Sequence, residues 1–277
     1  MKKLLLALSC ALLANFAFAA DEVITLKKFE GKNITGIEGS TGFQITVKQG
    51  SSTGATVKIS KKFEDRLIFE LDRNGTLRIG IKTDRNGINI SEGDVVTAEV
   101  VCQTIERISA SSGSNISLEG DYTTKSLSAT ASAGSQISNS GKITVNGNII
   151  QKSSAGAGCN LRVIKAVNVE ISASAASHAT FEGEVQSITG SFSAGATITI
   201  SGKGNRLNIT SSAGARANCA GFEAKDVKAS ATAGASIEVT VSGSLQASAV
   251  AGGNISYAGN PISTNFKNTA GGSIWAR

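Results

Sequence analysis

The chain of 277 residues has little of the residue types that carry most protein chemistry. It contains one His and one Pro, its aromatic residues amount to 5%, and its charged residues to 17%, against roughly 25% in typical globular proteins. One His and few carboxylates leave little material for acid–base catalysis or for a metal site. We therefore expect no catalytic residue, no metal ion and no cofactor, and the composition indicates more about architecture than about activity.

Long apolar runs are also scarce, and the one that exists lies at the N-terminus. Two lysines precede it, and residues 17–19 form an A-x-A cleavage site, which is the pattern of a secretory signal peptide. We expect residues 1–19 to be removed and the protein to be exported to the periplasm, the outer-membrane surface or the medium. A lipoprotein signal ending at Cys10 is the weaker alternative. No other run approaches the ~18 residues that span a bilayer, so no transmembrane segment is expected after the signal.

Charge and cysteine content exclude two further classes of protein. Residues 20–107 hold 13 basic and 13 acidic side chains, and residues 108–277 hold 12 and 8, so the small positive excess is dispersed. A nucleic-acid partner needs a basic stripe and is not expected. After the signal, the chain keeps Cys102, Cys159 and Cys219. An odd number gives at most one disulfide, which excludes a disulfide framework.

A short phrase of the form small-Ala-Gly-small-x-Ile recurs about every 20 residues in the second part of the chain. Its central position is Gly in eight of nine copies, with Ala176 as the exception. The copies are centred at residues 113, 134, 156, 176, 195, 214, 234, 252 and 271. Apolar and polar residues alternate around the phrases, which predicts strands with one buried face. Because no crossover helix fits the period, the sequence predicts an all-β fold, a parallel β-helix or β-solenoid of about nine coils over residues 108–277.

Small residues are expected to shape each coil at two places. Those on both sides of the central Gly indicate a place where opposite walls of the coil approach closely. A second Gly follows about seven residues later in several copies, as at Gly120 and Gly202. We expect this Gly to turn the chain onto its next wall.

Residues 20–107 are expected to form an antiparallel or irregular β segment, either a cap or a set of irregular first coils. Residues 72–75 and 84–87 both read Asp-Arg-Asn-Gly, a turn signal, and the first lies between two predicted strands. The segment Ser40–Ile45 also fits the repeat phrase. Either arrangement would cover one end of the solenoid, where unpaired strand edges otherwise aggregate. Strands are predicted at Ile24–Phe29, Phe43–Val47, Ala55–Ile59, Leu67–Leu71 and Leu77–Ile81.

A column of hydroxyl side chains is the candidate contact face. Two positions before the centre of the phrase, eight of nine copies carry Ser or Thr. These side chains are in the first place the polar half of an alternating strand. As a flat outward ladder they could also contact a glycan, another protein or ice. The column consists of Ser111, Ser132, Ser154, Ser174, Ser193, Ser212, Thr232 and Thr269.

The remaining reactive side chains are interpreted as structural. His178 falls in an outward column, and the chain has no second His that could complete a metal site or orient His178 as a general base. Cys159 and Cys219 fall in inward columns, three coils apart, which is too far for a disulfide. The nearest approach to a catalytic pair is Glu182 with Glu184, two residues apart on one strand face. Coil length varies only from 18 to 22 residues, which leaves no insertion that could build a cleft.

The front strands and the ordered phrases resemble the family of auto-transporter adhesins with a head GIN domain, which are secreted by Bacteroidetes and other Gram-negative bacteria. The resemblance rests on Phe43–Val47, Leu77–Ile79, the repeated Gly phrases, and the ending Tyr257–Pro261 followed by Gly271–Ile274. It covers nearly all of the chain after the signal. The resemblance implies a β-helix-like fold and a surface or periplasmic setting.

Together these features favour an exported, non-enzymatic β-solenoid that binds or supports structure at the cell envelope, with an adhesin-like use. Its partner is unknown, with a glycan or a surface protein as the two options. The alternative from another class is a carbohydrate-active β-helix enzyme, a polysaccharide lyase or hydrolase using Glu182 and Glu184.

Overall fold

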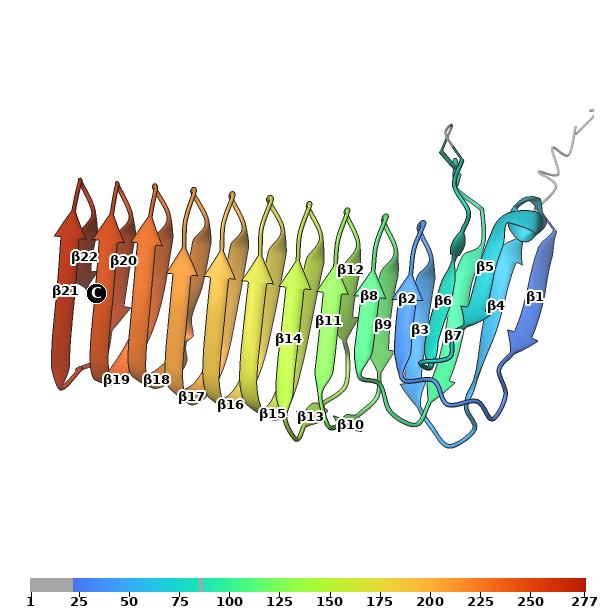
Figure 1. The fold of residues 1–277 in the computed structure, drawn as a ribbon, viewed down its shortest axis with the longest axis horizontal. Coiled ribbons are helices and arrows are strands. Elements are labelled where there is room, and N and C mark those ends of the chain that lie inside the picture. The colour runs from blue at the N-terminus through green and yellow to red at the C-terminus, as the bar shows by residue number, and fades with distance from the viewer. Residues whose placement is uncertain (1–21, 85–86) are drawn as a thin grey trace, which may run out of the picture.

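A computed structural model describes residues 22–84 and 87–277 as a long, flat stack of strands (Figure 1). Strands make up 66% of the structure and helix 2%, which confirms the all-β prediction. Among the described residues the one helix is the short 3-10 helix η1, Lys61–Arg66, and no helix there could cross a membrane. The expected signal peptide and Cys10 lie outside the described residues.

Each coil has two walls joined by a tight turn, and successive coils pair in parallel, which confirms the predicted β-solenoid. We call the strand segments before the turns the front wall and those after the turns the back wall. From Gly158 onward, one long strand covers the back wall, bends at the lower edge in Figure 1, and continues as the next front wall. Short strands at the lower edge of earlier coils are β10 (Tyr122–Thr124) and β13 (Ile143–Val145).

The bounds of the other solenoid strands follow. The front wall contains β2 (Gly36–Gly39), β8 (Arg107–Ala110), β11 (Leu127–Ala131), β14 (Asn148–Ser153) and β21 (Ser263–Thr269). The back wall contains β3 (Gln44–Gln49), β9 (Asn115–Glu119), β12 (Gln136–Asn139), β20 (Asn254–Ala258) and β22 (Ser273–Ala276). The long strands that serve both walls are β15 (Gly158–Ala173), β16 (His178–Phe192), β17 (Thr197–Ser211), β18 (Arg216–Thr232) and β19 (Ser236–Val250).

The repeat phrase forms the tight turn between the walls. In one copy, Ala133 has φ +49° and Gly134 φ +70°, and the Ser135 N–H donates to the Ser132 carbonyl oxygen at 3.2 Å. Two consecutive positive φ angles define a type I′ turn. Each turn tip also bonds to the next, as when the Gly134 N–H donates to the Ala155 carbonyl oxygen at 3.0 Å. The nine phrases of residues 108–277 bound eight complete coils, so the solenoid has about eight turns there rather than the expected nine.

The expectation that both small columns mark a close approach of the walls is wrong for the residue before the Gly. Ala133 is exposed at the turn tip, and its small size suits the left-handed backbone there, where a larger or branched side chain would add strain. The residue after the Gly is the one that lies inside. Ser135 is fully buried, and its hydroxyl donates to the Ala110 carbonyl oxygen in the preceding coil at 2.7 Å.

The first coil of the stack comes from the charge-rich N-terminal segment. Strands β2 and β3 pair in parallel with β8 and β9, and the Gly42 N–H in their turn donates to the Ser112 carbonyl oxygen at 3.0 Å. Ser40–Ile45 therefore lies in the column of repeat phrases. The chain then runs outward and back before the stack resumes at β8, so the coil of β2 and β3 is covered by strands that follow it in the sequence.

These covering strands change direction from parallel to antiparallel. β6 (Thr76–Ile81) and β7 (Val96–Cys102) pair in parallel with β2 and β3. β4 (Gly54–Ser60), β1 (Val23–Lys28) and β5 (Leu67–Leu71) then add antiparallel strands. The five predicted strands of this segment are present, and the predicted hairpin at residues 72–75 joins β5 to β6. Of the second turn, 84–87, residues 85–86 lie outside the described residues.

Candidate functional site

The eight predicted ladder residues lie in one column at the end of the front-wall strands, immediately before the turns. Seven of them are half-buried and Thr269 is exposed. Backbone bonds hold neighbouring members level, as when the Ser193 N–H donates to the Ala173 carbonyl oxygen and the Ser212 N–H to that of Phe192. The tight turn after every member gives all coils the same length at this edge, which keeps the column straight.

A second hydroxyl column runs beside the first and was not singled out from the sequence. Its members stand two residues earlier in each strand and pair from coil to coil, as Thr130 with Lys152 and Ser172 with Ser191. The period-two alternation of the strands was the signal that could have found it, because residues two apart share a face. The column consists of Ser109, Thr130, Lys152, Ser172, Ser191, Thr210, Ser230, Ser248 and Lys267.

The two columns together line a shallow trough of about 420 Å³ on the front wall. Strands of neighbouring coils lie ~4.8 Å apart and side chains two residues apart on a strand ~6.6 Å apart, so the hydroxyls form a regular grid. Such a grid suits an extended ligand with repeated polar groups better than a compact one. The trough is lined by Thr130, Lys152, Ser154, Ser172, Ser174, Ser191, Ser193, Thr210 and Ser212, with Ser153, Ala173 and Phe192 at its floor.

Two kinds of serine in the same turn have different tasks. The buried Ser177 hydroxyl accepts a bond from the Ser174 N–H at 3.0 Å and donates to the Ser153 carbonyl oxygen at 3.0 Å. Within the described residues, the ladder hydroxyls of Ser132, Ser154, Ser174, Ser193, Ser212 and Thr232 make no side-chain hydrogen bond. The fold therefore uses the buried hydroxyls for its own stability and leaves the ladder hydroxyls available to solvent or a ligand.

The trough carries positive charge only. Neither column contains a carboxylate, and the cation among the residues that line the trough is Lys152. Lys267 stands outside the trough, farther along the second column. In the part of the chain that the structure describes, Lys152 forms no ion pair. An anionic or neutral polyol would meet hydroxyls and an ammonium group there without repulsion.

The two candidate catalytic carboxylates are held in separate ion pairs. Glu182 Oε2 lies 3.1 Å from Arg162 Nε in one neighbouring coil, and Glu184 Oε1 lies 2.9 Å from Lys203 Nζ in the other. The hydrogen bond to Glu184 raises the pKa of Lys203. All four side chains are more than half exposed. This arrangement is a row of ion pairs on an exposed surface.

His178, Cys159 and Cys219 take the places expected from the columns. His178 faces outward on the back wall, and its ring covers Gly158, where a Cβ atom would collide with it. Cys102, Cys159 and Cys219 are buried free thiols. Burial raises the pKa of Cys102 to about 11 and those of Cys159 and Cys219 to about 12, so all three stay protonated and unreactive at neutral pH.

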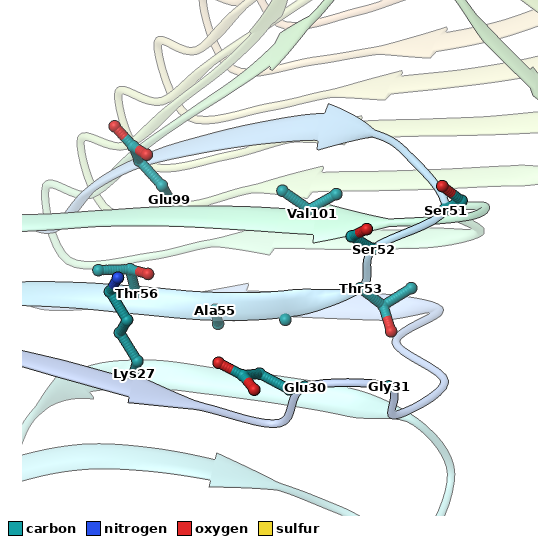
Figure 2. A pocket seen from close by; sticks show the side chains of 11 residues that line it. Lys27, Glu30, Gly31, Ser51, Ser52, Thr53, Ala55, Thr56, Glu99 and Val101 are labelled. Atoms are coloured by element: carbon teal, nitrogen blue, oxygen red, sulfur yellow. The ribbon is translucent and has the colours of Figure 1, made fainter.

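A second hollow, of about 500 Å³, lies on the antiparallel strands of the N-terminal segment (Figure 2). Lys27 on β1, Thr56 on β4 and Glu99 on β7 form a row across its floor. Glu30, Ser51 and the neighbouring loop residues form its rim. The described residues contain no group of three side chains that could hold a metal ion, here or elsewhere. The hollow is a mixed-charge surface groove that the sequence interpretation did not anticipate.

The comparison with protein families decides the classification. The family described as "Putative auto-transporter adhesin, head GIN domain" matches residues 33–141 and 136–261. The chain belongs to this family. The two matches overlap at 136–141 and together run from just before β2 into the last coil, which confirms the resemblance found in the sequence.

Crystal structures show that the solenoid is shared with other proteins. A putative adhesin from Parabacteroides merdae has a TM-score of 0.69 at 13% identity, covering 92% of this chain and 96% of its own. A putative adhesin and a putative lipid binding protein from Parabacteroides distasonis have TM-scores of 0.66 and 0.67 at 14% and 15% identity. Each covers 92% of this chain, and 97% and 96% of its own. No curated protein matches the sequence. At these identities the structures support the fold of this head GIN domain protein.

Proposed function

We propose that this head GIN domain protein is an exported, non-enzymatic scaffold of the cell envelope or surface that adheres to a glycan or to another surface protein through its front wall. The trough of unengaged hydroxyls carries this proposal, because it offers hydroxyl groups at the same two positions in successive coils, with the Lys152 ammonium group in place of one of them. The family description and the neighbours named as adhesins support a binding role. The N-terminal sequence, with its A-x-A site, supports export.

Binding is favoured over catalysis by the places of the reactive groups. The carboxylates that an enzyme would use are occupied by Arg162 and Lys203 on an open surface. The thiols are buried and protonated. A glycosidase needs two carboxyl groups that face one substrate bond, at separations of about 5 to 10 Å, inside a cleft that holds the sugar. The uniform coils supply a flat wall, which suits adhesion to an extended surface.

The test is a binding array of neutral and acidic glycans and matrix proteins, probed with the purified protein. Ser174→Arg with Ser193→Arg fills the trough with two large side chains, and we expect it to lower the affinity for any captured ligand at least ten-fold. Thr180→Arg with Thr199→Arg places the same side chains on the exposed back wall and should leave binding unchanged. Circular dichroism melting checks that both variants fold alike.

Three results would overturn the proposal. Equal binding by the trough variant and the wild type would show that another face is used. New reducing ends or unsaturated products that disappear on Glu182→Gln or Glu184→Gln would show an enzyme. Thermal hysteresis without glycan or protein binding would show that the hydroxyl grid binds ice.

A further inference from the structure

The trough on the front wall is long in one direction and narrow in the other. Its lining side chains come from five successive coils, on β11, β14, β15, β16 and β17, and from two neighbouring columns. At ~4.8 Å from coil to coil and ~6.6 Å between columns, the trough runs about 19 Å along the rod and is two side chains wide. A chain-like ligand parallel to the rod fits this shape, and about four linked sugar rings fill its length.

Lys152 is the one charged side chain in the lining. It is exposed and stands in the second column, paired with Thr130 on one side and Ser172 on the other. Within the described residues, no ion pair or side-chain hydrogen bond engages its ammonium group. The second coil of the trough therefore offers a free cation to an anionic group of a ligand.

Two neighbours of Lys152 lie just outside the trough. Ile150 precedes it by two residues on β14 and is 37% exposed, which gives a ring placed there an apolar contact. Glu170 pairs with Ile150 in the next coil, so its backbone lies diagonal to that of Lys152, at about 8 Å. At that separation on an exposed wall, Glu170 weakens the attraction of Lys152 for an anion without cancelling it.

The lining favours a carbohydrate over a protein partner. Protein interfaces draw most of their binding energy from Trp, Tyr and Arg side chains. The lining has none of these, and Phe192 is buried in its floor. It has eight hydroxyls in the two columns and one ammonium group. Because hydroxyls both donate and accept, they match sugar hydroxyls of either orientation. The complementary ligand is a mostly neutral sugar chain with widely spaced acid groups.

We propose that the trough binds an acidic polysaccharide that lies parallel to the rod, with the carboxylate of one uronic acid on Lys152 Nζ and the neighbouring neutral sugars on the hydroxyl columns. This inference rests on the proposed function and names the class of glycan. An exposed ion pair contributes a few-fold in affinity. Lys152 therefore selects acidic chains, whereas the hydroxyl columns hold any chain of the right shape.

Biolayer interferometry with immobilised polysaccharides tests the selection. The probes are gellan, which carries one glucuronate in each tetrasaccharide repeat, and hyaluronan, each used as it is and after chemical reduction of its carboxyl groups to alcohols. The reduced form keeps the sugar chain and loses the charge. We expect the wild type to bind the native form of at least one polymer about five-fold more tightly than its reduced form.

Variants of exposed side chains assign this preference to Lys152. Lys152→Gln should remove it and Lys152→Glu should reverse it, whereas Glu170→Gln should strengthen binding of the native polymer about two-fold. The matched control is Lys228→Gln, an exposed lysine of the same wall outside the trough, which should change nothing. Circular dichroism melting shows whether the variants fold alike.

The length of the bound chain tests its direction. Oligosaccharides prepared from the polymer that binds should gain affinity up to about four sugars and little beyond. A plateau at two sugars would mean that the chain crosses the trough, which overturns the proposed orientation.

Failure of this inference differs from failure of the front-wall proposal. A preference for the native polymer that persists in Lys152→Gln, binding to reduced forms alone, or capture of proteins without any acidic polysaccharide overturns the role of Lys152. The front wall still stands as the binding face if Ser174→Arg with Ser193→Arg abolishes that binding. Binding that survives both Lys152→Gln and the double variant overturns the two proposals together.

Discussion

The apolar core of the solenoid is covered at the N-terminal end of the rod and partly exposed at the C-terminal end. At the N-terminal end the chain leaves the repeat, adds antiparallel strands and closes the core with three phenylalanines, Phe29, Phe63 and Phe69. At the C-terminal end the repeat continues unchanged into β21 and β22, and Phe266 is left half in contact with solvent. The comparison shows that a coil which is stable inside the stack is incomplete at its boundary, because each coil buries its interior only against two neighbours.

Acidic side chains are concentrated toward the covered N-terminal end. The N-terminal segment holds more than half of the acidic residues within less than a third of the chain. Its strands β1, β4 and β5 form one end of the rod (Figure 1). Exposed ion pairs there, such as Lys61 with Glu22 at 2.6 Å, contribute little stability. Their charges keep that end soluble and discourage strand addition. The interior coils need no such protection and are correspondingly poor in charge.

Removing one aromatic ring at each end gives the largest expected effect. Phe69→Ala opens a cavity in the closed end and should lower the free energy of unfolding by about 3–4 kcal/mol. Phe266→Ala removes a ring that is already 42% exposed and should cost the monomer less than about 1 kcal/mol. Urea unfolding followed by circular dichroism measures both.

A second probe reports the open end alone. Trp275 is the one tryptophan of the chain and lies on β22, so its fluorescence follows the last coil. We expect Phe266→Ala to shift the fluorescence transition to lower urea than the circular dichroism transition, and Phe69→Ala to leave the offset between them unchanged. Equal losses of stability for the two variants would contradict the asymmetry of the ends.

The tight turns form a column that runs along the stack between the two ends. A substitution at the one central turn position of the nine copies that is not Gly should have a smaller effect on stability. Ala176 stands where eight other copies carry Gly, yet it keeps the turn, with φ +57° and its N–H donating to the Ala194 carbonyl oxygen at 2.9 Å. A left-handed residue with a Cβ costs roughly 1–2 kcal/mol. Ala176→Gly should therefore stabilise the chain by about 1 kcal/mol, measured by urea unfolding.

The control is the reverse substitution at the equivalent position of the neighbouring coil. Gly195 has φ +72° in the equivalent position, and Gly195→Ala should destabilise the chain by a similar amount. If the two substitutions change stability in the same direction, the left-handed backbone is not the cause. Since neither residue contacts the ends, both variants should keep the offset between the fluorescence and circular dichroism transitions.

The repeat made most of the fold predictable. The fixed spacing of the Gly phrase and the period-two alternation located the coils, the inward cysteines and the outward hydroxyl ladder. The alternation does not show which way the backbone turns, so Ala133 was expected inside and lies at an exposed tip. Strands β2 and β7 were not predicted, because their coil partners are distant in the sequence and no phrase links β6 to β7. The hydroxyl column at Thr130 and Ser172 lies outside the repeat phrase, so the phrase itself does not mark it.

The smallest expected effect is a difference between the two ends in how acid changes their local stability. The pKa of Asp72 lies below its usual value, mainly because the Thr76 N–H donates to its carboxylate at 2.8 Å, with the Asn74 N–H as a second donor at 2.8 Å. A carboxyl group with a lowered pKa in the folded state contributes stability above its unfolded pKa of about 3.9, and loses it as the pH falls through the folded pKa. Acid should therefore loosen the hairpin between β5 and β6.

Hydrogen exchange with mass spectrometry between about pH 4 and pH 2.5 measures this loosening, after correction for the intrinsic exchange rate. Peptides from residues 67–81 should lose protection a few-fold more than peptides from 254–276, which contain no carboxylate side chain. Asp72→Asn is the matched control, since its amide oxygen still accepts both N–H groups but does not titrate, and it should remove the difference. Equal acid responses at both ends would mean that the closed end owes nothing to this turn, and its stability would then rest on the phenylalanine contacts alone.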